Sequence, residues 1–191
     1  MEKKVVYRIA TIVDYDREAL YLRKMHAEGW KLKEVSYSNL VVAVKYTFEQ
    51  CQPKQVSYQL DFYPMKKSER ASYLQLFKDC GWEHITDFNS FSYFRKARSE
   101  VESSAEFEIY NDATNKLDMV NRILRLRLVP SFLLLAIHIP FLFILLDRSN
   151  TFDLWKFLVV GLDIFLSLIL LLMVVYISWK LWHKKKELSD L

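Results

Sequence analysis

Two long apolar runs in the last third of the sequence constrain the fold of this chain more than any other feature. Residues 128–146 contain no charged side chain, and residues 157–179 contain one, Asp163. A helix that crosses a bilayer needs about 20 mostly apolar residues at ~1.5 Å each, and both runs reach that length. Buried helices of a soluble domain are the alternative, but two such runs in succession are typical of membrane proteins. The sequence therefore predicts a hairpin of two transmembrane helices, 128–146 and 157–179.

The residues that flank the two runs predict the orientation of the hairpin, because lysine and arginine are retained on the cytoplasmic side of a membrane. Both termini are expected in the cytoplasm, with residues 147–156 as an external loop and residues 180–191 as a basic tail. Tryptophan favours membrane interfaces, and Trp155 is expected at the outer one, with Trp179 and Trp182 at the inner one. The basic inner edge comprises Arg122, Arg125, Arg127, Lys180, Lys184, Lys185 and Lys186.

The net charge of +4 belongs to this membrane-flanking region, because residues 1–121 carry 18 basic and 18 acidic side chains. A basic excess beside apolar runs favours contact with anionic lipid headgroups over the phosphate backbone of nucleic acid. The N-terminal stretch is interrupted by Arg8 and Asp14, unlike a signal peptide. Cys51 and Cys80 are therefore expected to be reduced thiols in the cytosol.

Residues 1–97 repeat one pattern twice, which predicts an α+β domain. Each half has an alternating strand, a helix that ends at a glycine, and two further strands. The expected elements are 5–12, a helix from about residue 14 to Gly29, 32–37 and 41–49, then 56–63, a helix from about residue 68 to Gly81, 83–86 and 91–96. Tandem βαββ units predict a ferredoxin-like domain with one antiparallel sheet and both helices on one face.

The faces of this sheet follow from the period-two pattern of the strands. Val5, Tyr7 and Ile9 share the apolar side of the first strand, and a helix is expected to cover that side. Tyr7 and Tyr58 are expected to hold equivalent places in the two halves. Whether the second face of the sheet is bare or covered stays open. Residues 98–111 are expected to be a linker, and residues 112–127 an amphipathic helix that continues into the first span.

Two polar residues lie inside the predicted hairpin. Counting ~1.5 Å per residue from the outer ends places Asp163 about 9 Å deep and His138 about 12 Å deep. A carboxylate in hydrocarbon costs on the order of 2.5–3.5 kcal/mol and is a candidate functional group. We expect a hydrogen bond between the two that fixes helix pairing. Two alternatives stay open: a proton relay or sensor, or a carboxylate that reaches the interface while His138 bonds to the backbone.

No motif predicts catalysis. The chain has 3 glycines, and it contains no phosphate-binding glycine loop, zinc-protease helix or serine elbow. Cys51 and Cys80 have no His or Cys neighbours at metal-binding spacing. The sequence therefore predicts no catalytic, cofactor-binding or metal-binding residues and no enzyme activity.

Several stretches between residues 1 and 127 carry a family resemblance. They read KVVYRIATIVDYDREALYLRKMHAEGWKL, YTFEQCQP, YQLDF, YFRKA and FEIYND, together with the Gly81-Trp82 step; the run Tyr46, Phe48, Cys51 and Pro53 is the most specific part. They resemble the bacterial domain-of-unknown-function 2812 family. The resemblance implies a small membrane protein with a cytoplasmic α/β domain, often encoded beside a PadR-type transcriptional regulator. It implies an accessory or regulatory role and supplies no catalytic residues.

These observations predict a multi-pass protein of a bacterial cell membrane that acts as a membrane-anchored interaction or regulatory module. The expected partners are the membrane, its anionic lipid headgroups, and a protein such as a transcriptional regulator or a membrane complex. Self-association is a further option, and neither direct nucleic-acid binding nor a cofactor is expected. The alternative function is an accessory subunit of a transport or resistance system, in which the hairpin packs against other transmembrane helices.

Overall fold

The computed structural model of the protein describes residues 2–9, 11, 13–39, 43–64, 66, 68–97, 113–147 and 154–189, of which 113–115, 141–147, 154–156 and 187–189 are described by their backbone alone. The chain forms two compact units, residues 1–115 and 116–191. The predicted linker, 98–111, and most of the predicted loop, 147–156, lie outside the described residues.

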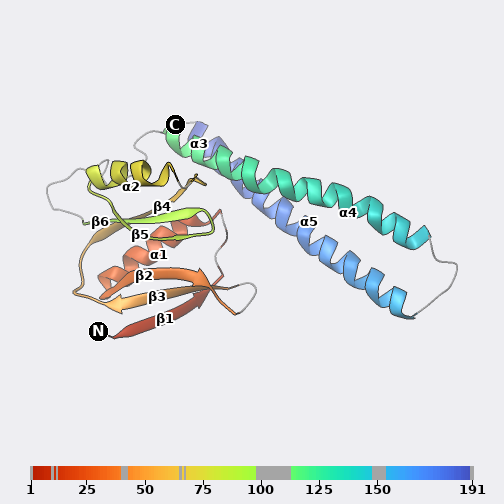
Figure 1. Cartoon of the computed structure of the whole chain (residues 1–191), viewed down its shortest axis with the longest axis horizontal. Coiled ribbons are helices and arrows are strands. Elements are labelled where there is room, and N and C mark those ends of the chain that lie inside the picture. The colour runs from red at the N-terminus through yellow and green to blue at the C-terminus, as the bar shows by residue number, and fades with distance from the viewer. Residues whose placement is uncertain are drawn as a thin grey trace. The chain divides into compact units, whose positions relative to one another are not determined.

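The first unit consists of two successive strand–helix–strand–strand segments (Figure 1). The first segment contains β1 (Lys3–Arg8), α1 (Tyr15–Ala27), β2 (Trp30–Tyr37) and β3 (Val44–Gln50). The second contains β4 (Val56–Phe62), α2 (Arg70–Asp79), β5 (Glu83–Phe88) and β6 (Phe91–Ala97). Each set of strands forms its own antiparallel sheet, in the order β1-β3-β2 for sheet A and β4-β6-β5 for sheet B. The predicted α+β class is confirmed, but the expected single sheet is wrong.

Helix α1 packs against both sheets, which corrects the expectation of two helices on one face of one sheet. Toward sheet A, the ring of Tyr21 meets the rings of Tyr46 and Phe48 edge-on, with centroids 6.3 and 6.2 Å away. Toward sheet B, Nδ1 of His26 lies 2.9 Å from the hydroxyl of Tyr58. The helix therefore supplies the core contacts of two separate sheets.

Helix α2 covers the face of sheet B that points away from α1. Phe77 stacks on Phe94 with ring centroids 4.2 Å apart, and Tyr73 donates a 2.6 Å hydrogen bond to Asp61 on β4. Asp61 is 2% exposed, so β4 is covered on both sides. Alternation of polar residues along β4 normally indicates a solvent-facing side. Here a buried carboxylate finds its hydrogen-bond partner on a helix instead.

The two segments match in their backbone details. Each helix ends at a glycine with positive φ, a conformation that glycine adopts without a steric penalty. Each sheet then shifts its register shortly after that glycine. The glycines are Gly29 (φ 89°) and Gly81 (φ 79°), and the shifts lie between Leu32 and Glu34 in sheet A and between His84 and Thr86 in sheet B.

The register of the strands defines which residues of the two sheets are equivalent. Counting outward from the matched shifts aligns Tyr7 with Phe62, and not with Tyr58 as the sequence predicts. The same register aligns Val5 with Leu60, Thr47 with Tyr93, Lys45 with Phe91, Glu49 with Arg95 and Lys3 with Tyr58.

The side of β1 that faces α1 is the opposite of the one that the periodicity of the strand predicts. Val6 pairs with Tyr46, and directly paired residues share a face, so Val6 points toward α1. Arg8 lies on the same side, and its guanidinium carbon is 3.6 Å from the ring centroid of a tyrosine on α1. Val5 and Tyr7, which were expected to be covered, are 46% and 54% exposed.

The second unit is a helical hairpin. Its first arm runs from α3 (Ala113–Ile123) through a π-helical turn, η2 (Leu124–Leu128), into α4 (Val129–Asp147). Its second arm, α5 (Leu154–Ser189), contacts both α4 and η2. The π turn lies just before Pro130, whose missing N–H interrupts the α-helical hydrogen-bond pattern. The helix α5 extends beyond the predicted span, so the basic residues after position 179 are helical.

Candidate functional site

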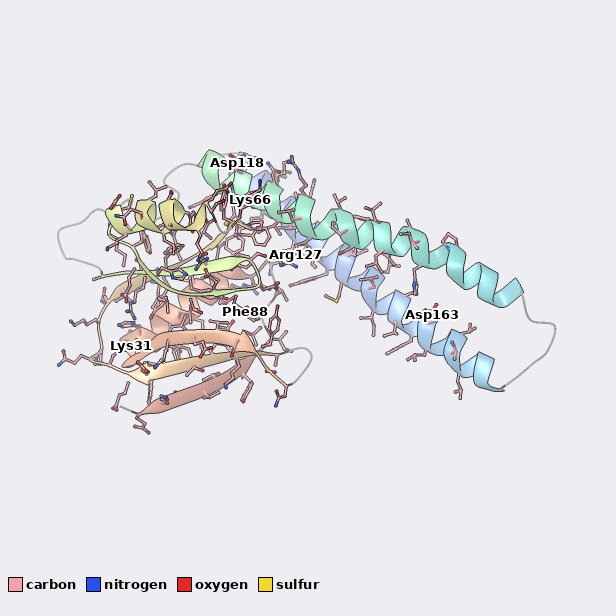
Figure 2. The ribbon with its side chains drawn as sticks, viewed as in Figure 1. Lys31, Lys66, Phe88, Asp118, Arg127 and Asp163 are labelled. Carbon is pink, nitrogen blue, oxygen red and sulfur yellow. The ribbon has the colours of Figure 1, made fainter. Side chains whose placement is uncertain are left out.

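The two polar residues of the hairpin meet in the structure. Nε2 of His138 on α4 lies 2.9 Å from Oδ1 of Asp163 on α5, and the two side chains are 30% and 25% exposed. Figure 2 labels Asp163 on the second arm. A neutral imidazole donates its N–H to the carboxylate in such a contact. The structure thus brings together the two residues that are expected at nearly the same depth, and their contact is a polar link between two apolar arms.

Three serine hydroxyls of the hairpin are satisfied within their own helices. Each donates to the carbonyl oxygen four residues earlier, which lets a serine sit in an apolar helix without a partner on another one. The bonds join Ser131 to Arg127 (2.7 Å), Ser167 to Asp163 (2.8 Å) and Ser178 to Val174 (2.7 Å). The contact of His138 with Asp163 differs from these because it crosses from one arm to the other.

Both arms of the hairpin expose apolar side chains. The most apolar 18-residue windows of the two spans, 116–140 and 157–186, have mean hydropathies of 1.6 and 2.9, and only 11% and 6% of these windows are buried. A core helix of a soluble protein would be apolar and mostly buried. By length, composition and exposure, these two helices are suited to cross a membrane.

The predicted basic residues gather at one end of the hairpin, because α5 runs back alongside η2. Arg122 lies at the end of α3, Arg125 and Arg127 lie on η2, and Lys180, Lys184, Lys185 and Lys186 lie on the last turns of α5. Trp179 and Trp182 are 60% and 59% exposed on the same turns. Both of their rings meet the imidazole of His183, at 4.8 and 5.1 Å between centroids. The side chain of Trp155 lies outside the described residues.

A second candidate site is the outer face of sheet A, which we define as its side chains pointing away from α1. Its apolar part consists of Val5 and Tyr7 on the edge strand β1, and Ile9, just after that strand, is 75% exposed. Exposed apolar side chains that cluster together are a mark of interaction surfaces. The outer face of sheet A comprises Lys3, Val5, Tyr7, Lys31, Lys33, Glu34, Ser36, Lys45, Thr47 and Glu49.

Glu49 is the centre of charge on this face. Its carboxylate lies 3.9 Å from Nζ of Lys31 and forms a closer ion pair with Lys33. The hydrogen bond from Lys33 lowers the pKa of Glu49. At the equivalent place in sheet B, Arg95 pairs with Glu83 across 2.6 Å. The two sheets therefore carry the same ion pair with the charges exchanged.

Sequence periodicity missed the outer face because it assigns the apolar side of β1 to the core. The register of β1 against β3 decides the matter, and a shift of one residue exchanges the two faces of a strand. The available signal lies in β3, where Tyr46 and Phe48 form the stronger apolar side and are buried at 1% and 0% exposure. The side of β1 that faces α1 is therefore fixed by β3 and not by β1 itself.

A partly buried polar contact joins the two sheets through α1. Tyr46 of sheet A and Tyr93 of sheet B each donate a 2.7 Å hydrogen bond to Oε1 of Glu18. Burial raises the pKa of Glu18, although the two hydroxyl groups and Arg8 act against that rise. An adjoining pocket of about 190 Å³ is smaller than the roughly 300–1,000 Å³ of small-molecule sites. We interpret Glu18 as a structural link between the sheets.

Within the part of the chain that the structure describes, no three His, Cys, Asp or Glu side chains come together as metal ligands would. The two thiols are unpaired, with Cys51 half-buried and Cys80 exposed. His26 is buried and bonded to Tyr58, whereas His84 lies near the surface with Asp87 at 2.9 Å. These contacts have the character of fold-stabilising interactions.

Comparison with known proteins adds a family assignment. A family model described as "Protein of unknown function (DUF2812)" matches residues 14–132, which include α1, both sheets apart from β1, and the start of the hairpin. No curated protein and no solved structure matches the chain. The family match covers more than half of the 191 residues, and the protein therefore belongs to the DUF2812 family of proteins of unknown function.

Proposed function

We propose that this protein is a membrane-anchored interaction module whose first unit lies in the cytoplasm and binds a partner protein. The observation that carries the proposal is the exposure of Val5 and Tyr7 on a folded domain that is attached to two apolar helices. A packed domain that leaves apolar side chains on an edge strand risks aggregation. Their retention is accounted for if a partner covers them.

The proposed orientation rests on the charge at the ends of the hairpin. Lysine and arginine at the η2 end of both arms favour a cytoplasmic position for that end, and with it for both termini. The same residues would contact anionic headgroups, at about 1 kcal/mol for each basic side chain near the surface. The hairpin then spans the membrane as an oriented pair of helices, with Trp179 and Trp182 at the inner interface.

The orientation is tested by labelling thiols in intact cells with a maleimide that does not cross membranes. Cys80, which is exposed on the first unit, is expected to react only after the cells are opened. A cysteine introduced by Asn150→Cys, between the two arms, is expected to react in intact cells. The reverse pattern, or reaction of neither thiol in opened cells, would overturn the orientation or the exposure on which it depends.

Protein binding is tested with a lysine-reactive crosslinker on native membranes that contain the full-length chain. We expect linked peptides that join lysines of the first unit to one other protein, such as a transcriptional regulator or a subunit of a membrane complex. The same reaction after denaturation in dodecyl sulfate is the control. If every linked peptide joins copies of this chain through the hairpin, the proposal of a protein-binding module fails.

The contact between His138 and Asp163 favours a second candidate function, an accessory subunit of a transport or resistance system. A carboxylate that meets an imidazole inside an apolar hairpin is a candidate for ion or proton handling. In that case the linked peptides would come from α4 and α5 and would join them to the transmembrane helices of another protein. The crosslinking experiment above distinguishes the two functions by the unit in which the links arise.

A further inference from the structure

The internal repeat reveals what is missing from sheet A. The face of sheet B that is equivalent to the outer face of sheet A is covered by α1. There Leu60 and Phe62 are 5% and 1% exposed, whereas their equivalents Val5 and Tyr7 are 46% and 54% exposed. The two sheets thus have the same topology, but a helix covers this face in sheet B and no helix that the structure describes covers the equivalent face in sheet A.

We propose that the outer face of sheet A is the docking site for an amphipathic helix of a partner protein, with acidic side chains beside its apolar stripe. This inference rests on the proposed function, because it specifies which surface of the first unit binds the partner. The docked helix takes the place on sheet A that α1 takes on sheet B.

The contacts of α1 with sheet B show how a helix occupies such a face. Tyr15 packs on Phe91 with ring centroids 6.1 Å apart, near the start of the helix. Glu18, in the next turn, accepts a hydrogen bond from the hydroxyl of Tyr93. His26, near the end of the helix, is hydrogen-bonded to the hydroxyl of Tyr58. Contacts repeated along one side of a helix are the pattern of a helix docked on a surface. The equivalent surface of sheet A offers Tyr7 and Val5 to the apolar stripe of the partner.

The charge of the outer face specifies the polar part of the partner helix. The face carries four lysines, Lys3, Lys31, Lys33 and Lys45, and two glutamates, Glu34 and Glu49. Glu49 engages Lys31 and Lys33. Lys45 stands where sheet B has Phe91 and forms no ion pair with any residue that the structure describes. A carboxylate on the partner helix would form an ion pair with Lys45. Such charge complementarity selects one partner over others.

The same charges argue against two other occupants. A second copy of this chain docked face to face would oppose two faces that each carry four lysines and two glutamates, so the net interaction of their charges is repulsive. An anionic membrane surface attracts basic side chains by about 1 kcal/mol each, but here Glu34 and Glu49 lie in the face and the latter already engages two lysines. An acidic helix satisfies the excess charge and covers the apolar stripe at once.

The experiment places the photo-crosslinking amino acid p-benzoylphenylalanine at Tyr7 in the full-length chain and irradiates native membranes. The product is digested and the captured segment is identified by mass spectrometry. We expect one segment of another protein, with apolar residues at helical spacing and acidic residues beside them. The matched control places the same amino acid at Leu76, which is 62% exposed on α2, and it is expected not to capture that segment.

Charge reversal tests the complementarity. Lys45→Glu is expected to lower the yield of the product about ten-fold, the effect of losing roughly one ion pair. Lys78→Glu, on the exposed side of α2, is expected to leave the yield unchanged. Replacing the facing acid of the captured segment by lysine is expected to restore the yield with Lys45→Glu. Tyr7→Ser and Val5→Ser, which change no charge, are each expected to weaken capture from a probe at the other position.

Several results would overturn the inference. One is the capture of lipid, of a second copy of this chain or of residues 98–112 of the same chain. Another is the capture of a protein segment without the acidic helical pattern. The absence of any crosslinked product would also overturn it. If one of these results were found together with links from Leu76, or from another position of the first unit, to a second protein, the proposed function would still be supported. The failure of the docking site is therefore separate from the failure of the interaction module.

Discussion

Tyr46 and Tyr93 belong to different sheets, yet their hydroxyl groups donate to the same carboxylate oxygen, Oε1 of Glu18, over 2.7 Å each. The two tyrosines are 1% and 2% exposed, so neither hydroxyl can turn to bulk water. Glu18 belongs to α1, the helix that both sheets share. The two halves of the first unit are thus joined by a partly buried polar contact, in addition to the apolar packing of α1 against both sheets.

Loss of one of these hydroxyl groups is expected to weaken the first unit. Tyr93→Phe keeps the ring and removes one hydrogen bond to a carboxyl group, which lowers the free energy of unfolding by about 1–2 kcal/mol. Urea denaturation of the full-length chain in detergent micelles, followed by intrinsic fluorescence, measures the change. Tyr37→Phe, at a residue that is 77% exposed, is the control and is expected to stay within about 0.5 kcal/mol of the parent.

Glu18→Gln is expected to become relatively more stabilising as the pH rises. The folded-state pKa of Glu18 is raised, chiefly by burial, so folding favours the protonated form. The stability contributed by that form is complete below the unfolded-state pKa of about 4.3 and is lost as the pH rises through the folded-state value. Glutamine cannot ionise and escapes this loss. Parallel melts at pH 5 and pH 8 should show the variant gaining on the parent at pH 8; an equal difference at both pH values would contradict the assignment.

The first unit is expected to lose stability on acidification through His26. Burial, with Arg95 and Lys31 nearby, lowers the pKa of His26 to about 4. The Tyr58 hydroxyl accepts the Leu32 N–H, which leaves its own proton for Nδ1 of the neutral His26 ring at 2.9 Å. The unfolded chain takes up this proton near pH 6.5, so stability falls as the pH drops from about 6.5 to 4, by on the order of 2 kcal/mol. His26→Asn should flatten that slope, whereas His84→Asn should leave the His26 contribution in place.

Alanine at the two helix-ending glycines is expected to be costly to different extents. Both glycines have positive φ, which strains any other residue by roughly 1 kcal/mol or more. A Cβ at Gly29 would also lie 3.2 Å from the carbonyl oxygen of Cys51, and that backbone is held by the 2.8 Å bond from Cys51 N to Gly29 O. At Gly81 the nearest atom is the flexible Cε of Lys96, at 3.4 Å. Thermal melts should rank Gly29→Ala as the less stable variant.

The hairpin contact is expected to appear as coupling between its two residues. Asp163→Ala and His138→Ala should be non-additive, with an interaction free energy of about 0.5–1.5 kcal/mol, the range of polar contacts between membrane helices. Unfolding of the full-length chain in bicelles, measured for both single variants and the double variant, gives this value. Ser178→Ala combined with His138→Ala is the control, because Ser178 bonds within its own helix and should add without coupling. Additivity in both cycles would exclude a stabilising role for the pair.

Much of the local structure follows from neighbouring residues and was predictable for that reason. Helices α1 and α2 end at glycines, and strands β4 and β6 begin where their apolar alternation begins. The two long helices follow from the length of their apolar runs, which no other element can bury. The level of His138 and Asp163 follows from the constant rise of a helix, so a count of residues placed them together before any packing was known.

What the sequence by itself determined, then, is the element order, the two apolar helices and the polar pair within them, because each depends on spacing along one chain segment. Only the tertiary structure decided that the strands divide into two sheets, that α1 serves both, and that Val5 and Tyr7 face outward. Those outcomes depend on which strands pair and in which register, and a register is set by contacts between residues far apart in the sequence. The strong apolar side of β3 fixed the side of β1 that faces the helix, and the exposed stripe on sheet A is the consequence.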